Sequence, residues 1–386
     1  MTKMLRHQRF KGIAGEIPID TDYLDEQVPE LAGTHRHASY YLAQGVDSGL
    51  NPTRFFLTDW YAWQNPDCLD RHGAPYLHYL DVGLPEGRDP SPFVDVVRYL
   101  DATGGSVMRE GVYGAILAGL RAPVLGVYDS ASDLWGRQRD FMAGISVYAH
   151  RTALPTRPRR ALVVCQAGRG ALLDGWAKTE ERNWDLLINY YDAKGFRHDL
   201  GDYAVFQKGT KFTGMKLLIE RFPEIISQYD HVLFLDDDVE TTAGDLDALF
   251  AACRHHGLDL AQMSLTPSSS CNWEHLFSRP GTRGTRRVSA VEIMMPVFSK
   301  RALGWIAPTL GQSVSGFGLD LVWGHIVAEN GGRIAVLDEV AATHARPVDQ
   351  SGGAYYRYLR GHGINAKAEL WTLVTQYGAD RELVSL

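Results

Sequence analysis

Three consecutive carboxylates, Asp236, Asp237 and Asp238, follow the short apolar run of residues 232–235. The run is too short for an ordinary helix and has the length of a buried strand. Because side chains alternate along a strand, Asp236 and Asp238 would share one face if the chain stayed extended, with Asp237 on the other. Ligands of open α/β sheets bind outside the carboxyl ends of strands. Paired acids there need a cation, a shared proton or a solvated turn, and a hard divalent ion with substrate phosphates fits best.

The alternative for this stretch is a solvated loop without a ligand. On that interpretation Asp238 and Glu240 lead into a helix over residues 243–254, and Thr241 or Thr242 caps the helix.

Other candidate site residues occur later in the chain. Glu292 lies within an apolar run, where a carboxylate is costly unless it is paired, so it is either a site residue or a satisfied structural acid. Asp320 opens a predicted helix over residues 319–329 after a glycine turn, where it either favours the positive helix end or acts as a base. His344 follows a predicted strand over residues 334–342. A lone histidine is commonly structural, but a position just past a strand end makes it a candidate ligand.

These residues need strands and helices to position them. From residue 161 onward, predicted strands alternate with predicted helices, which indicates βαβ units and a mostly parallel sheet. The expected strands cover residues 161–165, 186–191, 232–235, 258–265 and 334–342, and the expected helices cover residues 212–221, 243–254 and 319–329. The expected fold class is therefore α/β.

Two other phosphate chemistries do not fit the sequence. A P-loop requires a lysine directly after its last glycine, but Trp176 and Ala177 separate Gly175 from Lys178. A haloacid-dehalogenase-like phosphatase would need threonine or valine at position 240, where the chain has glutamate, and its aspartates would follow the first strand.

The N-terminal part of the chain repeats itself at a spacing of about 37 or 38 residues, which is typical of a repeated helical hairpin. Residues 21–24 recur as residues 58–61, and residues 45–52 recur as residues 83–90. Such a unit buries its apolar face only by stacking on a neighbour. A scaffold or docking module is therefore expected here.

Composition restricts the function classes. The net charge is -7 and the pI is about 6.1, which argues against general nucleic-acid binding. No apolar run has the roughly 18 residues needed to span a bilayer, and residues 1–11 are polar and basic, so a cytoplasmic protein without a membrane span is expected. The four cysteines are widely scattered, so neither a zinc site nor a disulfide framework is indicated.

Residues 229–240, 291–300 and 318–320, with His344, resemble in type and order the domain-of-unknown-function 707 family, which looks like a branch of the GT-A glycosyltransferases. The family's usual Asp-Glu-Asp motif has aspartate at its centre here. Residues 19–100 resemble helical repeats attached to bacterial polysaccharide glycosyltransferases. The resemblance implies a GT-A-like catalytic domain with a Rossmann-like, mostly parallel mixed sheet, preceded by an all-α repeat module.

The domains expected on this basis are four. They are a helical repeat module over residues 1–98, a helical connector over residues 99–158, the GT-A-like domain over residues 159–350 and a C-terminal helical extension over residues 351–386.

The resemblance also implies a role for each matching residue. Asp236, Asp238 and His344 would bind Mn²⁺ or Mg²⁺, with the imidazole favouring Mn²⁺. Asp320 would be the catalytic base of an inverting enzyme. The remaining roles are nucleotide-sugar binding by Asp192, Lys211, Asp236 and Asp237, and acceptor binding by Glu292 and Trp323.

The expected function is metal-dependent transfer of a sugar from a nucleotide-sugar donor to a saccharide acceptor in bacterial polysaccharide or glycan synthesis. No nucleic-acid partner is expected, and peripheral association with a glycan assembly complex fits the repeats. The alternative is a non-catalytic carbohydrate-binding or assembly scaffold with a degenerate GT-A domain.

Overall fold

The computed structural model describes residues 17–71, 74–97, 99, 131–155, 159–179, 181–279, 281–282, 284–347 and 353–382. It divides into two compact units, Met1–Leu134 and Trp135–Leu386, and the boundary falls within the expected connector. The part of that connector over residues 100–130, with a helix predicted over residues 112–120, lies outside the described residues, as do residues 156–158 of the predicted linker.

The first unit is helical. Its elements are α2 (Thr21–Gln27), η1 (Pro29–Leu31), α3 (His37–Tyr40), η2 (Tyr41–Gly45), α4 (Thr58–Gln64), α5 (Asp67–Arg71), α6 (Pro75–His78) and η3 (Tyr79–Gly83). The elements α4, α6 and η3 follow α2, α3 and η2 at the spacing of the sequence echo. Buried aromatic side chains form the centre of this unit, and among them Tyr61 Oη lies 3.0 Å from His78 Nδ1.

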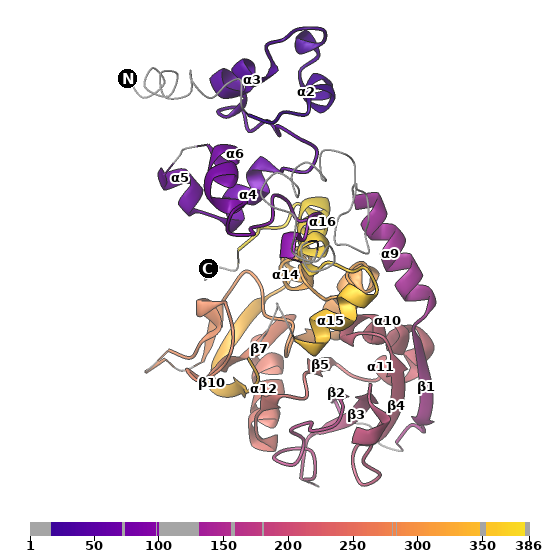
Figure 1. The fold of residues 1–386 in the computed structure, drawn as a ribbon. Coiled ribbons are helices and arrows are strands. Elements are labelled where there is room, and N and C mark those ends of the chain that lie inside the picture. Colours follow the sequence, from indigo (N-terminus) through magenta and orange to yellow (C-terminus); the bar gives the residue numbers. More distant parts are fainter. Residues whose placement is uncertain are drawn as a thin grey trace. The chain divides into compact units, whose positions relative to one another are not determined.

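The second unit is built on one mixed sheet (Figure 1). Its strands are β1 (Ser146–Arg151), β2 (Ala161–Ala167), β3 (Trp184–Tyr190), β4 (Tyr203–Lys208), β5 (His231–Leu235), β6 (Val239–Glu240), β7 (Leu260–Leu265), β8 (Thr285–Arg287), β9 (Val297–Ser299) and β10 (Ile334–His344). The strand order is β1-β4-β3-β2-β5-β9-β7-β10-β6, and β8 pairs with β10. The central strands β4, β3, β2, β5, β7 and β10 run in one direction, and β9 runs antiparallel among them.

The expected α/β class with a mostly parallel sheet is confirmed. Strands β2, β3, β5 and β7 consist of buried residues throughout, as expected for strands covered on both faces. The apolar run of residues 291–299 forms only the short strand β9, which lies antiparallel between β5 and β7. Local hydrophobicity predicts that such a segment is buried but does not predict its direction.

Helices flank the sheet. They are α9 (Ala131–Ala143), α10 (Lys211–Arg221), α11 (Pro223–Ile226), α12 (Ala243–His256), α13 (Lys300–Ile306), α14 (Leu319–Glu329), α15 (Ala354–Gly361) and α16 (Ala366–Tyr377), with short 3-10 turns η5 (Ala193–Gly195), η6 (Glu274–Leu276) and η7 (Ala307–Thr309). Thr242 caps α12 by accepting a hydrogen bond from Asp245 N at 3.1 Å, which confirms one of the two predicted caps. Among the described residues, no helix combines the length and apolar character needed to cross a membrane.

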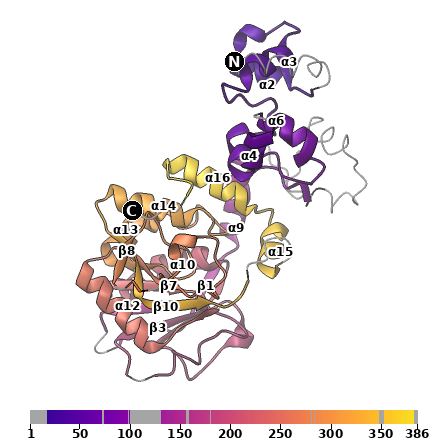
Figure 2. The same ribbon diagram turned by 90° about the vertical axis from the view of Figure 1, so that its left-hand side faces the viewer.

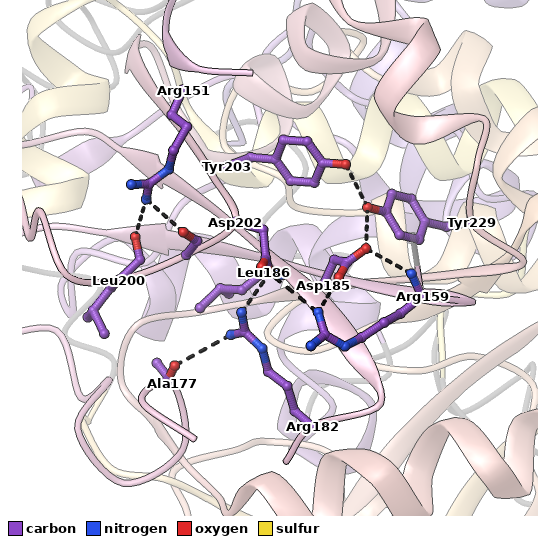
Figure 3. Close-up of polar contacts among 11 residues, drawn as sticks. Arg151, Arg159, Ala177, Arg182, Asp185, Leu186, Leu200, Asp202, Tyr203 and Tyr229 are labelled. Carbon is purple, nitrogen blue, oxygen red and sulfur yellow. Dashed lines mark hydrogen bonds and ion pairs between the residues drawn. The ribbon is translucent and has the colours of Figure 1, made fainter. Parts of the chain in front are cut away.

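A buried polar network fixes the amino edge of the sheet (Figure 3). The three aspartates lie at the opposite edge, after β5. Asp185 accepts hydrogen bonds from Arg159 Nη1 at 2.6 Å and from Tyr229 Oη at 2.8 Å. Tyr203 Oη lies 2.9 Å from Tyr229 Oη. Because a buried carboxylate is stable only with donors, this network ties β3, β4 and the residues before β2 and β5 together without using any candidate site residue.

Candidate active site

The three aspartates lie at the carboxyl end of β5, next to the point where the sheet's strand order changes direction. β2 pairs in parallel with β3 on one side and with β5 on the other. Open α/β sheets bind ligands outside such a switch point. β5 ends at Leu235, and the chain turns through Asp237 and Asp238 instead of staying extended. The two flanking carboxylates therefore do not share one strand face, and each aspartate has its own set of partners.

Asp236 forms an ion pair with a lysine. Lys211 Nζ lies 2.8 Å from Asp236 Oδ1, and it also donates to the carbonyl oxygens of Ile293 at 2.5 Å and Met294 at 3.1 Å. These three contacts use the three donors of the ammonium group. Burial raises the pKa of Asp236, and the Lys211 charge offsets part of that rise. Lys211, which was predicted to approach a diphosphate, holds the residues before β9 against the end of β5.

Asp237 is buried and anchors the neighbouring loops. Its Oδ2 accepts hydrogen bonds from Gly168 N at 3.0 Å and from Tyr191 Oη at 2.9 Å, and its Oδ1 lies 3.6 Å from Arg346 Nη1. Burial raises the pKa of Asp237, and these hydrogen bonds work against the rise. A Cβ on Gly168 would lie 2.4 Å from the Tyr191 ring, so a larger residue here would displace the Tyr191 side chain from Asp237. Asp237 thus links the loops after β2 and β3 to the residues after β10.

Asp238 lies beside His344. The Asp238 Oδ1 and His344 Nε2 atoms are 3.5 Å apart. They meet because β6 pairs antiparallel with the end of β10, which puts His344 opposite Val239. Burial disfavours the charge of Asp238, but the hydrogen bond and charge of His344 outweigh it and lower the pKa of Asp238. The predicted strand before His344 extends through this residue, so the histidine is the last residue of β10.

The imidazole of His344 is held from its other side. Its Nδ1 lies 2.7 Å from Ser270 O, and its backbone N donates to Ser269 Oγ at 3.1 Å. Because Ser270 O only accepts, Nδ1 carries the proton and Nε2 faces Asp238. Burial disfavours the charged ring, but the Asp238 and Ser270 hydrogen bonds outweigh it and raise the pKa of His344 to about 9.

Two further carboxyl groups influence each other electrostatically. Burial and the nearby charge of Asp320 raise the pKa of Glu292 to about 7. Burial raises the pKa of Asp320 to about 6, although Leu321 N donates to Asp320 Oδ1 at 2.9 Å. Glu292 Oε2 accepts from Met294 N at 2.6 Å, and Glu292 N donates to Gln262 Oε1 at 2.7 Å. Acids whose pKa values lie near neutrality are suited to proton transfer.

The two remaining predicted residues, Asp192 and Trp323, have partners outside the three aspartates. Asp192 follows β3, where its Oδ1 caps η5 by accepting from Lys194 N at 2.9 Å, and its Oδ2 lies 3.8 Å from Arg169 Nε. Trp323 has no exposed surface, and its Nε1 donates to Thr309 Oγ1 at 2.9 Å. Its ring packs edge-on against Phe212 with the centroids 5.1 Å apart. The fully buried indole packs α14 onto the core.

The donor chemistry of Asp238 and His344 fits a divalent ion that takes its other ligands from phosphate and water. One carboxylate and one imidazole would provide two protein ligands if a bound ion displaced the proton from Nε2, and Ser270 orients the ring through Nδ1. Asp236, the third predicted ligand, is paired with Lys211. Within the described part of the chain, no three His, Cys, Asp or Glu side chains form a metal-binding group. These residues therefore do not form a closed structural metal site with four protein ligands.

Sequence patterns did not identify Tyr191 and Arg346, which also lie at this edge. Arg346 Nη2 donates to Gly170 O at 2.6 Å, and its side chain is about half exposed. Arg346 stands two residues after His344, so proximity to a candidate ligand was the one available signal. Tyr191 follows β3 directly, as Asp236 follows β5.

Neither a protein-family model nor a curated protein sequence matches the chain. Among solved structures, the chain is similar to GalNAc-T7 with UDP, GalNAc and Mn²⁺, with 9% identity and a TM-score of 0.37 over 52% of this chain and 47% of that chain. It is also similar to residues 1–349 of S. aureus TarS in complex with UDP-GlcNAc, with 13% identity and a TM-score of 0.35 over 56% of this chain and 73% of that chain. The chain thus spans about half the length of GalNAc-T7.

Proposed function

We propose that the chain is a metal-dependent glycosyltransferase that moves a sugar from a nucleotide-sugar donor to a saccharide acceptor. The observation that carries the proposal is the 3.5 Å approach of Asp238 and His344 at the switch point of the sheet. A carboxylate and an oriented imidazole at this edge suit an ion that also binds a diphosphate. The resemblance of residues 229–240, 291–300 and 318–320 to a GT-A-like family points the same way. The resemblance of residues 19–100 to repeats attached to bacterial polysaccharide glycosyltransferases supports a role in bacterial glycan synthesis.

On the donor side, Asp238 and His344 would hold Mn²⁺ or Mg²⁺. When bound, such an ion supplies positive charge that offsets the charge developing on the leaving diphosphate. Arg346, tied to Asp237 and Gly170, adds a fixed guanidinium at the same edge, and guanidinium groups bind phosphate oxygens in a defined geometry. Asp192, just after β3, is proposed to contact the base or ribose. Asp236 keeps the Lys211 charge close to this edge.

On the acceptor side, Asp320 is proposed as the general base and Glu292 as an acceptor ligand. The acceptor hydroxyl gives its proton to the Asp320 carboxylate, and its oxygen forms the new bond to the anomeric carbon. The bond from that carbon to the diphosphate oxygen breaks, and its electron pair leaves with the diphosphate. A single displacement of this kind inverts the anomeric configuration and needs no covalent sugar intermediate.

The alternative function is a non-catalytic carbohydrate-binding or assembly scaffold. The observation that favours it is the Asp236–Lys211 ion pair, which neutralises one of the predicted metal ligands. A scaffold requires no base, so its sugar binding would be unaffected by removal of the Asp320 carboxylate.

A panel of nucleotide sugars with Mn²⁺ or Mg²⁺, followed by product analysis, tests the proposal. Transfer or donor hydrolysis that is lost in both Asp238→Ala and Asp320→Ala supports it. Thermal stabilisation by a nucleoside diphosphate that requires the metal would support the donor site separately, because a ligand of the folded state raises the melting temperature. Turnover that is unchanged in both variants would exclude the proposed mechanism.

A further inference from the structure

The C-terminal helix α16 carries one fully buried carboxylate, Glu369, which is 1% exposed. Its Oε1 accepts hydrogen bonds from Gln138 Nε2 and Val314 N, both at 2.7 Å. Its Oε2 accepts from Ser315 N at 2.7 Å and from Ser313 Oγ at 3.2 Å. Burial of a carboxylate is costly unless donors surround it, and here both oxygens are satisfied. Three of these partners belong to the loop that precedes α14.

That loop leads directly to Asp320, the second residue of α14. Gly316 and Gly318 have φ angles of 85° and 84°, which favour glycine. Gly316 N donates to Ser313 Oγ at 3.0 Å, and Leu319 N donates to Gly316 O at 3.2 Å. The position of the Asp320 carboxylate therefore depends on how residues 313–318 are held.

Other C-terminal residues hold the same loop. Tyr355 Oη on α15 donates to Ser315 O at 3.0 Å, and Tyr377 Oη on α16 lies 3.2 Å from Gln312 Oε1. A Cβ on Gly318 would lie 3.0 Å from Leu370 Cα, so the backbone of α16 approaches the start of α14 closely. Figure 2 shows α16 running next to α14. The loop is thus fixed from the C-terminal segment at several points, and Glu369 provides the most hydrogen bonds.

We propose that Glu369 is a positioning residue that orients Asp320 through the loop of residues 313–318. The inference rests on the proposed function of Asp320 as a base and extends it to a helix outside the sheet. A base works only within hydrogen-bond reach of the proton that it takes. A displacement of about 1 Å can cost roughly 100-fold in rate. Glu369 itself contacts no reacting atom, so its effect passes through the loop.

The test is Glu369→Gln, which keeps the side-chain shape but turns one acceptor into a donor facing a backbone N–H. We expect kcat to fall roughly 10- to 100-fold while the Kd for a nucleoside diphosphate stays unchanged. We also expect faster hydrogen exchange at the amides of Val314 and Ser315. The matched control is Glu329→Gln, which changes an exposed glutamate at the far end of α14 and should alter neither quantity.

A double-mutant cycle separates positioning from general stabilisation. If Glu369 acts through Asp320, Glu369→Gln lowers activity much less in an Asp320→Asn background than in the wild type. Fully additive losses, or exchange at residues 314–315 that equals the wild-type rate, overturn the inference. If Glu369→Gln does not fold, Gln138→Ala removes one donor to Glu369 and should lower kcat in the same direction by a smaller factor.

The outcome also distinguishes this inference from the proposed function. A wild-type protein that transfers no sugar from any donor of the panel refutes the proposed function and, with it, the catalytic coupling. A wild-type protein that transfers sugar, together with a Glu369→Gln variant of unchanged kcat, refutes the positioning role alone.

Discussion

Asp238 Oδ1 and His344 Nε2 lie 3.5 Å apart although more than a hundred residues separate them in sequence. The pairing of β6 with the end of β10 brings these residues together, and Ser270 O fixes the imidazole from behind. The pair lies next to the switch point between β2 and β5, where the carboxyl ends of parallel strands meet. This relationship motivates the first prediction.

Replacing Asp238 with asparagine should abolish most metal-dependent transfer. The change removes the anionic ligand while keeping the size of the side chain, so we expect a fall in kcat/KM of about 100-fold or more. The measurement is the transfer rate as a function of Mn²⁺ concentration. Glu240→Gln, an exposed change two residues further on, serves as the control and should leave the rate as it is. An Asp238→Asn enzyme with a wild-type metal response would contradict the assignment.

Replacing Asp320 with asparagine should lower kcat roughly 100-fold or more, because an amide cannot accept the proton of the acceptor hydroxyl. The base works only when ionised, and burial raises the pKa of Asp320 to about 6. In the wild type, kcat/KM should therefore decline as the pH falls below about 6, and residual activity of the variant should lack that decline. Rates measured between pH 5 and pH 8, in buffers of roughly constant ionic strength, check this prediction. A wild-type profile that stays flat down to pH 5 would exclude Asp320 as the base.

At neutral pH, the buried Asp320 carboxylate should lower the free energy of unfolding. The pKa of Asp320 is higher in the folded chain than the 3.8 of the free side chain, so folding favours the protonated form. The stabilisation that the protonated Asp320 provides is fully present below pH 4. It is lost as the carboxyl group ionises and the pH rises through about 6. At pH 7 to 8, Asp320→Asn should therefore raise the free energy of unfolding by up to about 3 kcal/mol. Urea denaturation at pH 4 and at pH 8 tests this, and a variant that is less stable than the wild type at pH 8 would contradict it.

Lys211→Met should destabilise the second unit. The substitution removes the charge partner of Asp236 and two further hydrogen bonds, to the carbonyl oxygens of Ile293 and Met294. Since the pair is only partly buried, we expect a loss of about 1–3 kcal/mol in the free energy of unfolding. Lys208→Met, an exposed change just before α10, is the matched control. Equal denaturation midpoints for the two variants would show that the ion pair contributes little.

Much of the architecture follows from the sequence alone. Short, largely apolar runs predicted the strands β2, β3, β5 and β7, because a strand covered on both faces is mostly apolar. Another such run predicted β10, whose first four residues are buried. The alternation of strands with helices predicted the α/β class. The sequence also predicted that the three aspartates come directly after β5, because the change from apolar to acidic residues marks the end of the strand. Thr242 as the cap of α12 belongs to the same group of local predictions.

The partners of the site residues were decided only by the tertiary structure. Sequence spacing gave no sign that Lys211 would pair with Asp236, that Trp323 would lie inside the core, or that Glu369 would hold the loop before Asp320. Such contacts join segments that are far apart along the chain, and they depend on strand order and on the antiparallel insertion of β9. Local periodicity records which side of a segment is buried, whereas the geometry of a site depends on which segments become neighbours when the chain folds.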